Sequence, residues 1–428
     1  MKKTYCDYTP RYLRMGEFMM GIDGVLYTPS ETPKPTGVVI LHSDSDYLNF
    51  PGGAALARRG FLTLCANVEN SADPLERKLG SVCRAVEALK AQPGIEKFVL
   101  LGHSGGATLM SCYQAVAENG PDIFRDGHRI VKMGAVDELP AADGIMLIDS
   151  NFGNGVMTLV SIDPGVIDES RGIGADKAYD AFAPESGFTR DGETRYTEEF
   201  KNRFYAAQAA RQERLIALAL ERLEALESGI GAYVDDEPLI APGASQIAPN
   251  NRLFPQDLHL LAHTKNAYDL IHGRDGSVTH EIIRSLRTAR GDLYGTPIYS
   301  LGAMNTTVRT YLSSQCVRTL PGYGVKEDGI DGIDYDSAFC CTPGNVKHIH
   351  APMLIMGMTG GYECIASEVI YENAASSDKT IAFVEGGTHM LSTAHDAEEY
   401  PGQFGDAAET LFDAIAGWLD NKFEKERL

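Results

Sequence analysis

The chain has 428 residues, of which 43% are hydrophobic and 23% are charged, and its formal net charge is -21 at pH 7. This length exceeds what one simple core needs, so we expect either a large domain that carries an insertion or two domains. Nucleic-acid binding requires clustered lysine and arginine, so the acidic balance argues against a nucleic-acid partner.

Nothing in the sequence suggests export or a membrane. Residues 1–8 contain two lysines but no apolar run behind them, and no stretch approaches the ~18 uninterrupted apolar residues of a membrane span. None of the eight cysteines forms a C-x-x-C pair, and several lie in apolar segments such as residues 62–65. The sequence therefore predicts a soluble, cytoplasmic protein with reduced thiols and no membrane partner.

In the first 155 residues, short apolar runs alternate with helical patterns. The pattern predicts strands at residues 37–42, 61–66, 98–101 and 144–149, and helices at 52–60, 75–89 and 107–117. Such alternation is typical of βαβ units that build a mostly parallel sheet.

Residues 156–348 lack this regular alternation. Their clearest element is a helix over 198–228, which Gly229 and Gly231 end. The remainder is rich in turn residues, and we interpret its glycine-rich segment 329–332 as turns as well. We interpret the region as a cap packed over the α/β body. This divides the chain into a first core part (1–155), a cap or insertion domain (156–348) and a second core part (349–428).

The alternation returns towards the C-terminus. Strands are predicted at 352–356 and 380–384, and helices at 366–375 and 407–423. The last helix carries an apolar face that includes Trp418, the only tryptophan, for which we predict a packing role.

The segment Gly102-His103-Ser104-Gly105-Gly106 points to chemistry. A G-x-S-x-G pattern alone is weak evidence, because a glycine-rich turn can hold an incidental serine. Here the pattern follows the strand at 98–101 directly and opens the helix at 107–117, the strand–turn–helix setting that presents a nucleophilic serine. Glycines two residues either side of Ser104 leave the room that so sharp a turn needs. We therefore interpret Ser104 as a nucleophile.

In these features the two α/β blocks resemble the α/β-hydrolase superfamily. The resemblance implies an α/β fold with a mostly parallel, eight-stranded sheet, helices on both faces, a large and mainly helical cap insertion, and a site at the carboxyl edge of the sheet. It also implies that the base follows the last strand, which points to His389 in the segment 386–390. His395 is a competitor six residues later that we rank second.

Two carboxylates remain open as the third catalytic residue. The usual location in the superfamily is the loop after the strand at 352–356, where Glu363 is the only acid, although it lies about three residues later than the family pattern expects. Asp149, at the end of the strand at 144–149, is the alternative. The usual location favours Glu363.

The oxyanion hole is expected to use backbone N–H groups. The resemblance points to Gly105 together with Ser43 or Asp44, in the segment that follows the strand at 37–42. Asp44 and Asp46 place two carboxylates near a developing negative charge, and the sequence leaves open whether they cap a helix or contact a polar or cationic substrate group.

Other polar side chains near the motif are candidates for the substrate pocket: His42, Asp46, Tyr47 and His103. A metal set of His42, His348 and His350 is not supported, because no carboxylate spacing accompanies these histidines. We therefore predict neither a metal nor another cofactor.

The function these residues imply is a serine esterase. Ser104 would attack an ester-like carbonyl of a small molecule, with His389 as general base, and water would release the acyl group. The alternatives are an acyltransferase, a carbon–carbon bond hydrolase, and a catalytically silent binding protein of the same fold. The sequence is also compatible with a homo-oligomer.

Overall fold

A computed structural model of the chain describes residues 5–16, 21–170, 176–190, 193–245, 251–288 and 302–424. The prediction that the protein is not exported used residues 1–8, and residues 1–4 of these lie outside the described ranges.

The centre of the structure is a ten-stranded sheet, with the order β1-β2-β4-β3-β5-β6-β13-β14-β8-β9. Eight strands come from the two α/β blocks, and the pairings from β4 through β3, β5, β6, β13 and β14 to β8 are parallel. The predicted α/β fold with a mostly parallel sheet is thus confirmed, but the sheet has ten strands instead of the predicted eight, and its pairings at both ends are antiparallel. The strand bounds are β1 (Tyr8–Met15), β2 (Ile22–Pro29), β3 (Thr36–Leu41), β4 (Thr63–Ala66), β5 (Lys97–His103), β6 (Gly144–Ile148), β8 (His263–Ile271), β9 (Val278–Arg284), β13 (Met353–Met358) and β14 (Lys379–Val384).

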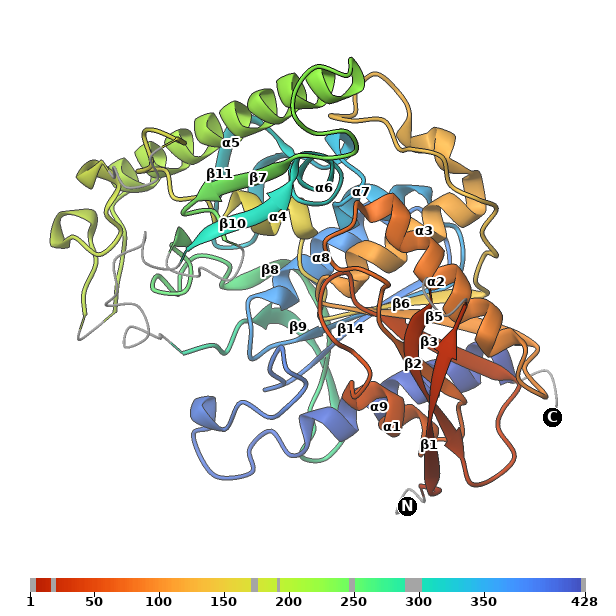
Figure 1. Ribbon diagram of the computed structural model, residues 1–428. Coiled ribbons are helices and arrows are strands. Elements are labelled where there is room, and N and C mark those ends of the chain that lie inside the picture. Colours follow the sequence, from red (N-terminus) through yellow and green to blue (C-terminus); the bar gives the residue numbers. More distant parts are fainter. Residues whose placement is uncertain are drawn as a thin grey trace.

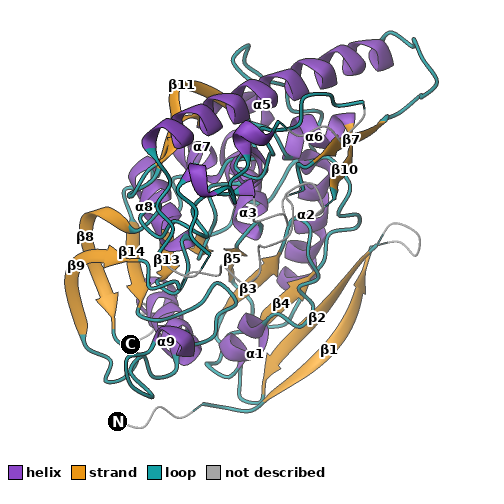
Figure 2. Cartoon of the chain, turned by 90° about the vertical axis from the view of Figure 1, so that its left-hand side faces the viewer, coloured by secondary structure: helices purple, strands orange, loops and turns teal. Residues whose placement is uncertain are grey.

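Helices cover both faces of this sheet (Figure 2). One face carries α2 (Leu75–Lys90), α3 (Gly106–Asn119) and α8 (Glu363–Asn373), and the other carries α1 (Pro51–Ala57) and α9 (Ala407–Leu419). The side chains of a strand point alternately to the two faces. Val39 of β3 therefore joins the core under α2 and α3, while Val38 joins the core under α1 and α9.

Trp418 belongs to the core under α1 and α9, so its predicted packing role is confirmed. The central strands β3, β4, β6 and β13 are buried along their whole length, which is why they read as continuous apolar runs.

The insertion contains more strands than we predicted. Its described helices are α4 (Asn154–Leu159), α5 (Glu198–Glu227), α6 (Val308–Ser314) and α7 (Thr342–Asn345), and α5 confirms the long helix predicted at 198–228. Two small antiparallel sheets pair β7 (Pro238–Pro242) with β10 (Ala303–Thr307), and β11 (Arg318–Val325) with β12 (Ile330–Asp334). In Figure 1, α5 runs along the top of the molecule, beyond α2, α3 and α8.

Two strands of the insertion lie in the main sheet. β8 pairs in parallel with β14, and β9 forms the free edge beyond it. The sequence missed this because neither strand carries a continuous apolar run: β8 buries only three of its nine residues, and β9 exposes six of its seven. The role of residues 156–348 as a cap and the domain bounds at 155 and 348 stay predictions.

Two further observations concern the described part of the chain. None of its helices is both long and apolar enough to cross a membrane. All eight cysteines are free thiols, six of them buried, as the sequence predicts.

Arg211 connects α5 to the neighbouring loops through an ion pair and hydrogen bonds. Its side chain has no exposed surface, and its guanidinium contacts both carboxylate oxygens of Glu169 at 2.8 and 2.7 Å. It also donates to the backbone carbonyls of Asp163 and Pro242, at 2.7 and 2.6 Å. A buried cation is tolerated only when its donors are satisfied in this way.

We predict that Arg211→Met destabilises the protein by about 3–5 kcal/mol, because the change leaves a carboxylate and two buried carbonyls without their donor. Thermal and urea denaturation would measure the loss. Arg203→Met, on the same helix but at a half-exposed position, is the matched control and should change the stability little. Equal denaturation midpoints for the two variants would contradict the prediction.

Candidate active site

Neighbouring strands bring the candidate residues to one edge of the sheet. His103 of β5 lies opposite Ile148 of β6 in a parallel pairing, so the next residues, Ser104 and Asp149, leave the sheet side by side. β13 and β14 continue the parallel order, and His389 lies in the turn after β14. The carboxyl ends of parallel strands share one edge, which is where sites form in such sheets.

The turn that carries Ser104 has the strained geometry that its glycines suggest. Ser104 has φ 56°, in the left-handed region that side chains other than glycine rarely adopt. A Cβ at Gly102 would lie 2.6 Å from the Cα of Ala107, and one at Gly106 would lie 2.6 Å from the carbonyl oxygen of Leu41. The two glycines are therefore required for the turn to pack between β5, α3 and β3.

Backbone strain also marks a second candidate. Among the described residues other than glycine, only four have positive φ, namely Ser104, Asp149, Leu261 and Leu391. Asp149 has φ 42°, and Leu391 lies two residues after His389. Strained positions tend to occur at functional sites, and here three of the four belong to the turns that meet at this edge.

His389 lies between Ser104 and Asp149. Its Nε2 is 2.9 Å from Ser104 Oγ, and its Nδ1 is 2.7 Å from Asp149 Oδ2. A carboxylate can only accept, so Nδ1 carries a proton, and in the neutral ring Nε2 is free to accept the serine hydroxyl proton. His395, the competing base, pairs with Glu398 on the surface and touches neither residue.

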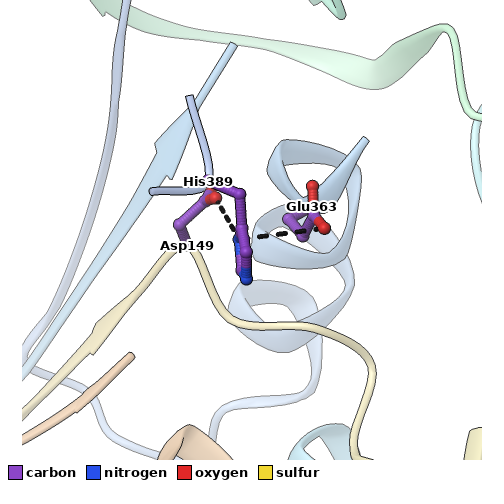
Figure 3. Close-up of side chains that lie close together, drawn as sticks. All are labelled: Asp149, Glu363 and His389. Atoms are coloured by element: carbon purple, nitrogen blue, oxygen red, sulfur yellow. Dashed lines mark hydrogen bonds and ion pairs between the residues drawn. The ribbon is translucent and has the colours of Figure 1, made fainter. Parts of the chain in front are cut away.

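Both candidate acids approach the ring of His389 (Figure 3). Asp149 is fully buried and makes the hydrogen bond, and its Oδ1 accepts the backbone N–H of Met358 at 2.8 Å. Glu363 Oε1 is 3.7 Å from the same Nδ1, beyond ordinary hydrogen-bond distance. The geometry therefore favours Asp149 as the partner of the imidazole, with Glu363, the first residue of α8, as a second charge beside it.

The two carboxylates govern the titration of His389. Burial of the ring lowers its pKa, but the charge of Glu363 and the hydrogen bond to Asp149 outweigh that effect and raise the pKa to about 9. Burial raises the pKa of Asp149, against the stabilising effect of His389. The imidazole is consequently cationic at neutral pH and becomes a base as the pH rises through about 9.

The segment after β3 supplies the other side of the site. The backbone N–H of Asp44 donates to His42 Nδ1 at 3.0 Å, so it is not available to an oxyanion. Of the two donors predicted in this segment, this leaves the N–H of Ser43. An added Cβ at Gly105 would lie 3.0 Å from Ser43 Oγ, so the two candidate donor residues are neighbours.

The structure shows which groups partner the two carboxylates of this segment. Asp44 forms an ion pair with Lys78 at 2.9 Å, and only 1% of the Lys78 side chain is exposed. Asp44 also accepts hydrogen bonds from Ser43 Oγ and Asn154 Nδ2. Asp46 instead accepts from the N–H of Leu48 and from Asn67. Sequence reasoning missed Lys78 and Asn154, because neither lies near a motif.

A pocket of about 380 Å³ opens on Ser104 and His389. It is lined by all four residues that the sequence proposes for substrate contact, and also by Phe50 and Met390, which the sequence did not single out: His42, Asp46, Tyr47, His103, Phe50 and Met390. The side chain of His42 is buried, which lowers its pKa to about 4, and its Nδ1 accepts two backbone N–H groups. The ring of His42 is thus a neutral wall of the pocket.

A metal could in principle use the same acids. Ligand atoms of Asp149, Glu363 and His389 lie within 4.8 Å of one another, and oxygen and imidazole nitrogen are ligands that Zn²⁺ accepts. In the arrangement found here His389 Nδ1 is hydrogen-bonded to Asp149, so the residues form a hydrogen-bonded chain. The histidines His348 and His350 are not part of this cluster.

Comparisons with known proteins add little to this geometry. No family model and no curated protein matches the sequence. One solved structure that aligns with it is Est1E from Butyrivibrio proteoclasticus, at 10% identity over 96% of this chain and 99% of that chain, with a TM-score of 0.40. Another is DcsB in complex with its substrate analogue, at 11% identity over 97% of this chain and 100% of that chain, with a TM-score of 0.44. A hormone-sensitive lipase from a metagenome library aligns at 10% identity over 97% and 87% of the chains, with a TM-score of 0.39. At these scores the fold assignment rests on the sheet and on the turn at Ser104.

We predict that His389 titrates near pH 9 in the free protein. NMR of the imidazole nitrogens would follow the titration, and His389→Ala would identify the signal by removing it. Glu363→Gln should lower this pKa, because it removes the charge that raises it most, while His395→Ala should leave it unchanged. A His389 signal that titrates near 6.5 in both the wild type and Glu363→Gln would contradict the electrostatic account.

Proposed function

We propose that this chain, whose fold is that of the α/β-hydrolase superfamily, is a serine hydrolase that transfers an acyl group from a small-molecule ester to water. The single observation that carries the proposal is the hydrogen-bonded chain from Ser104 through His389 to Asp149, with distances of 2.9 and 2.7 Å. A nucleophile, a base and an acid that orients the base are the parts that acyl transfer through a serine requires.

In the proposed reaction, Ser104 Oγ attacks the ester carbonyl as His389 Nε2 takes the hydroxyl proton. Asp149 holds the ring in the tautomer with the proton on Nδ1 and stabilises the imidazolium that forms. The N–H groups of Gly105 and Ser43 would receive the oxyanion. His389 then gives its proton to the leaving alcohol, and a water molecule activated by the same nitrogen releases the acid and restores Ser104.

The surroundings of the nucleophile support this assignment. A carboxylate close to an oxyanion would oppose the reaction, but Asp44 is paired with the buried Lys78. The pocket of about 380 Å³ lies in the lower part of the range found for small-molecule sites. His42, Tyr47 and Phe50 give it neutral walls, and the carboxylate of Asp46 on its lining disfavours an anionic acyl group.

The first test is covalent labelling with a fluorophosphonate, read by intact-mass analysis. We expect one adduct on the wild type, none on folded Ser104→Ala, and labelling of His389→Ala that is slower by about 10²–10⁴-fold, because the serine loses its base. His395→Ala is the matched histidine control and should react like the wild type. A well-folded wild type that reacts with neither this probe nor a smaller phosphonate would favour the silent binding protein instead.

The second test separates the two acids by the hydrolysis of a chromogenic ester. Asp149→Asn should reduce kcat by about 10⁴-fold, because the amide holds the ring in the wrong tautomer. In Glu363→Gln the hydrogen bond to Asp149 remains, so we expect a reduction below about tenfold, together with a shift of the pH profile of kcat/KM to lower pH. The reverse order of the two effects would assign the acid to Glu363.

In the wild type, kcat/KM should rise with pH and reach half its plateau near pH 9, since the base is the neutral form of His389. Added alcohol distinguishes hydrolysis from acyl transfer, because an acyltransferase would convert part of the ester into a new ester.

A further inference from the structure

His103, the residue before the nucleophile, has two hydrogen-bonding partners that the proposed reaction does not use. Its Nε2 is 2.8 Å from the backbone carbonyl oxygen of His389, and its Nδ1 is 2.6 Å from the hydroxyl of Tyr47. Only 3% of the residue is exposed, so solvent cannot replace either partner. The same ring stacks on the ring of His389, with centroids 4.9 Å apart and planes inclined by 30°.

Hydrogen-bond chemistry determines the tautomer of His103. A carbonyl oxygen can only accept, so the proton must lie on Nε2. Burial holds the pKa of His103 well below its usual value, and the ring is therefore neutral. In a neutral ring with its proton on Nε2, the other nitrogen has no hydrogen and accepts the Tyr47 hydroxyl. Tyr47 thus favours the tautomer that donates to His389.

Packing fixes Tyr47 in turn. Its ring lies parallel to Phe50, with centroids 4.6 Å apart and an angle of 7°, and it lies 4.7 Å from the ring of His42. Because Tyr47 is 9% exposed and packs against two rings, its hydroxyl has little freedom to turn away from His103.

We propose that His103 is a positioning residue, which ties the main chain of His389 to the turn of the nucleophile, and that Tyr47 selects the tautomer that makes this bond. The proposal rests on the proposed function of Ser104 and His389. Ser104 and His103 are adjacent in the chain, so the bond to the His389 carbonyl links the position of the base directly to that of the nucleophile. The other backbone hydrogen bonds of the His389 turn are internal, such as Thr388 N–H to Ser392, or join it to the loop after β13, as in Gly360 N–H to Gly387.

The expected effect is on the chemical step rather than on binding. A displacement of about 1 Å between reacting groups can cost about 10²-fold in rate. His103→Phe keeps a stacked ring but loses both hydrogen bonds, while His103→Gln keeps an N–H donor near the position of Nε2. His348→Phe, at a half-buried histidine outside the pocket, is the matched control.

The test measures the maximal rate of fluorophosphonate inactivation and the half-saturating probe concentration separately. We expect His103→Phe to lower the maximal rate 10- to 100-fold, with a change below about threefold in the half-saturating concentration. His103→Gln should keep most of the wild-type rate. Tyr47→Phe should lower the maximal rate less than His103→Phe does. His348→Phe should match the wild type. If the wild type is labelled and His103→Phe reacts equally fast, or if Phe and Gln are equally slow, the proposal is wrong; no labelling of the wild type instead refutes the proposed function.

A second measurement does not depend on activity, and its main readout comes from the wild type. The ¹⁵N chemical shifts of His103 in the wild type should show a neutral ring with the proton on Nε2 between pH 6 and 8, and Tyr47→Phe should broaden or shift this pattern. A proton on Nδ1, or a ring that titrates in this range, would overturn the proposal.

Discussion

The hydrogen bond between Ser104 and His389 joins residues that are 285 positions apart in the chain. No local structure could hold them together, so the contact depends on the register of the parallel strands between them. β5 pairs with β6, β6 with β13, and β13 with β14, and each pairing brings the carboxyl ends of its two strands into line. A slip of one residue in any pairing would turn the side chains of that strand to the opposite face. The buried apolar side chains on both faces of β3, β5, β6 and β13 oppose such a slip.

The register has an energetic cost at its edge. Ser104 and Asp149 both take left-handed backbone conformations, which cost on the order of 1–3 kcal/mol each. Asp149 also loses its hydration, which the N–H of Met358 and the imidazole of His389 offset. The packing of the two extensive, continuous cores on either side of the sheet offsets these unfavourable free energies. Packing elsewhere in the α/β body therefore maintains the strained backbone conformations at this edge.

Charge is divided between the two sides of Ser104. On one side, Asp149 and Glu363 both approach one imidazole, and their charges favour the cationic ring. On the other side, Asp44 is matched by Lys78, and the neutral rings of His42 and His103 line the pocket. Asp149 and Glu363 thus act on the base, while the charge of Asp44, beside the region proposed for the oxyanion, is offset by Lys78. This separation reconciles an acidic segment after β3 with a site for developing negative charge.

The sequence by itself determined the α/β class, the setting of Ser104 and His389, and, to within a few residues, the strands and helices of both blocks from β3 onwards. It could do so because these elements follow short-range rules: apolar runs, helical periodicity, and glycines in a turn too tight for side chains. It did not locate β1 or β2. It could not choose between Asp149 and Glu363, since both follow strands that end at the same edge and only the final side-chain distances separate them. It likewise missed β8 and β9, which carry no continuous apolar run. The pairing of Asp44 with Lys78 and the bond from His103 to the backbone of His389 were decided by the tertiary structure alone, because long-range packing creates contacts that no local pattern encodes.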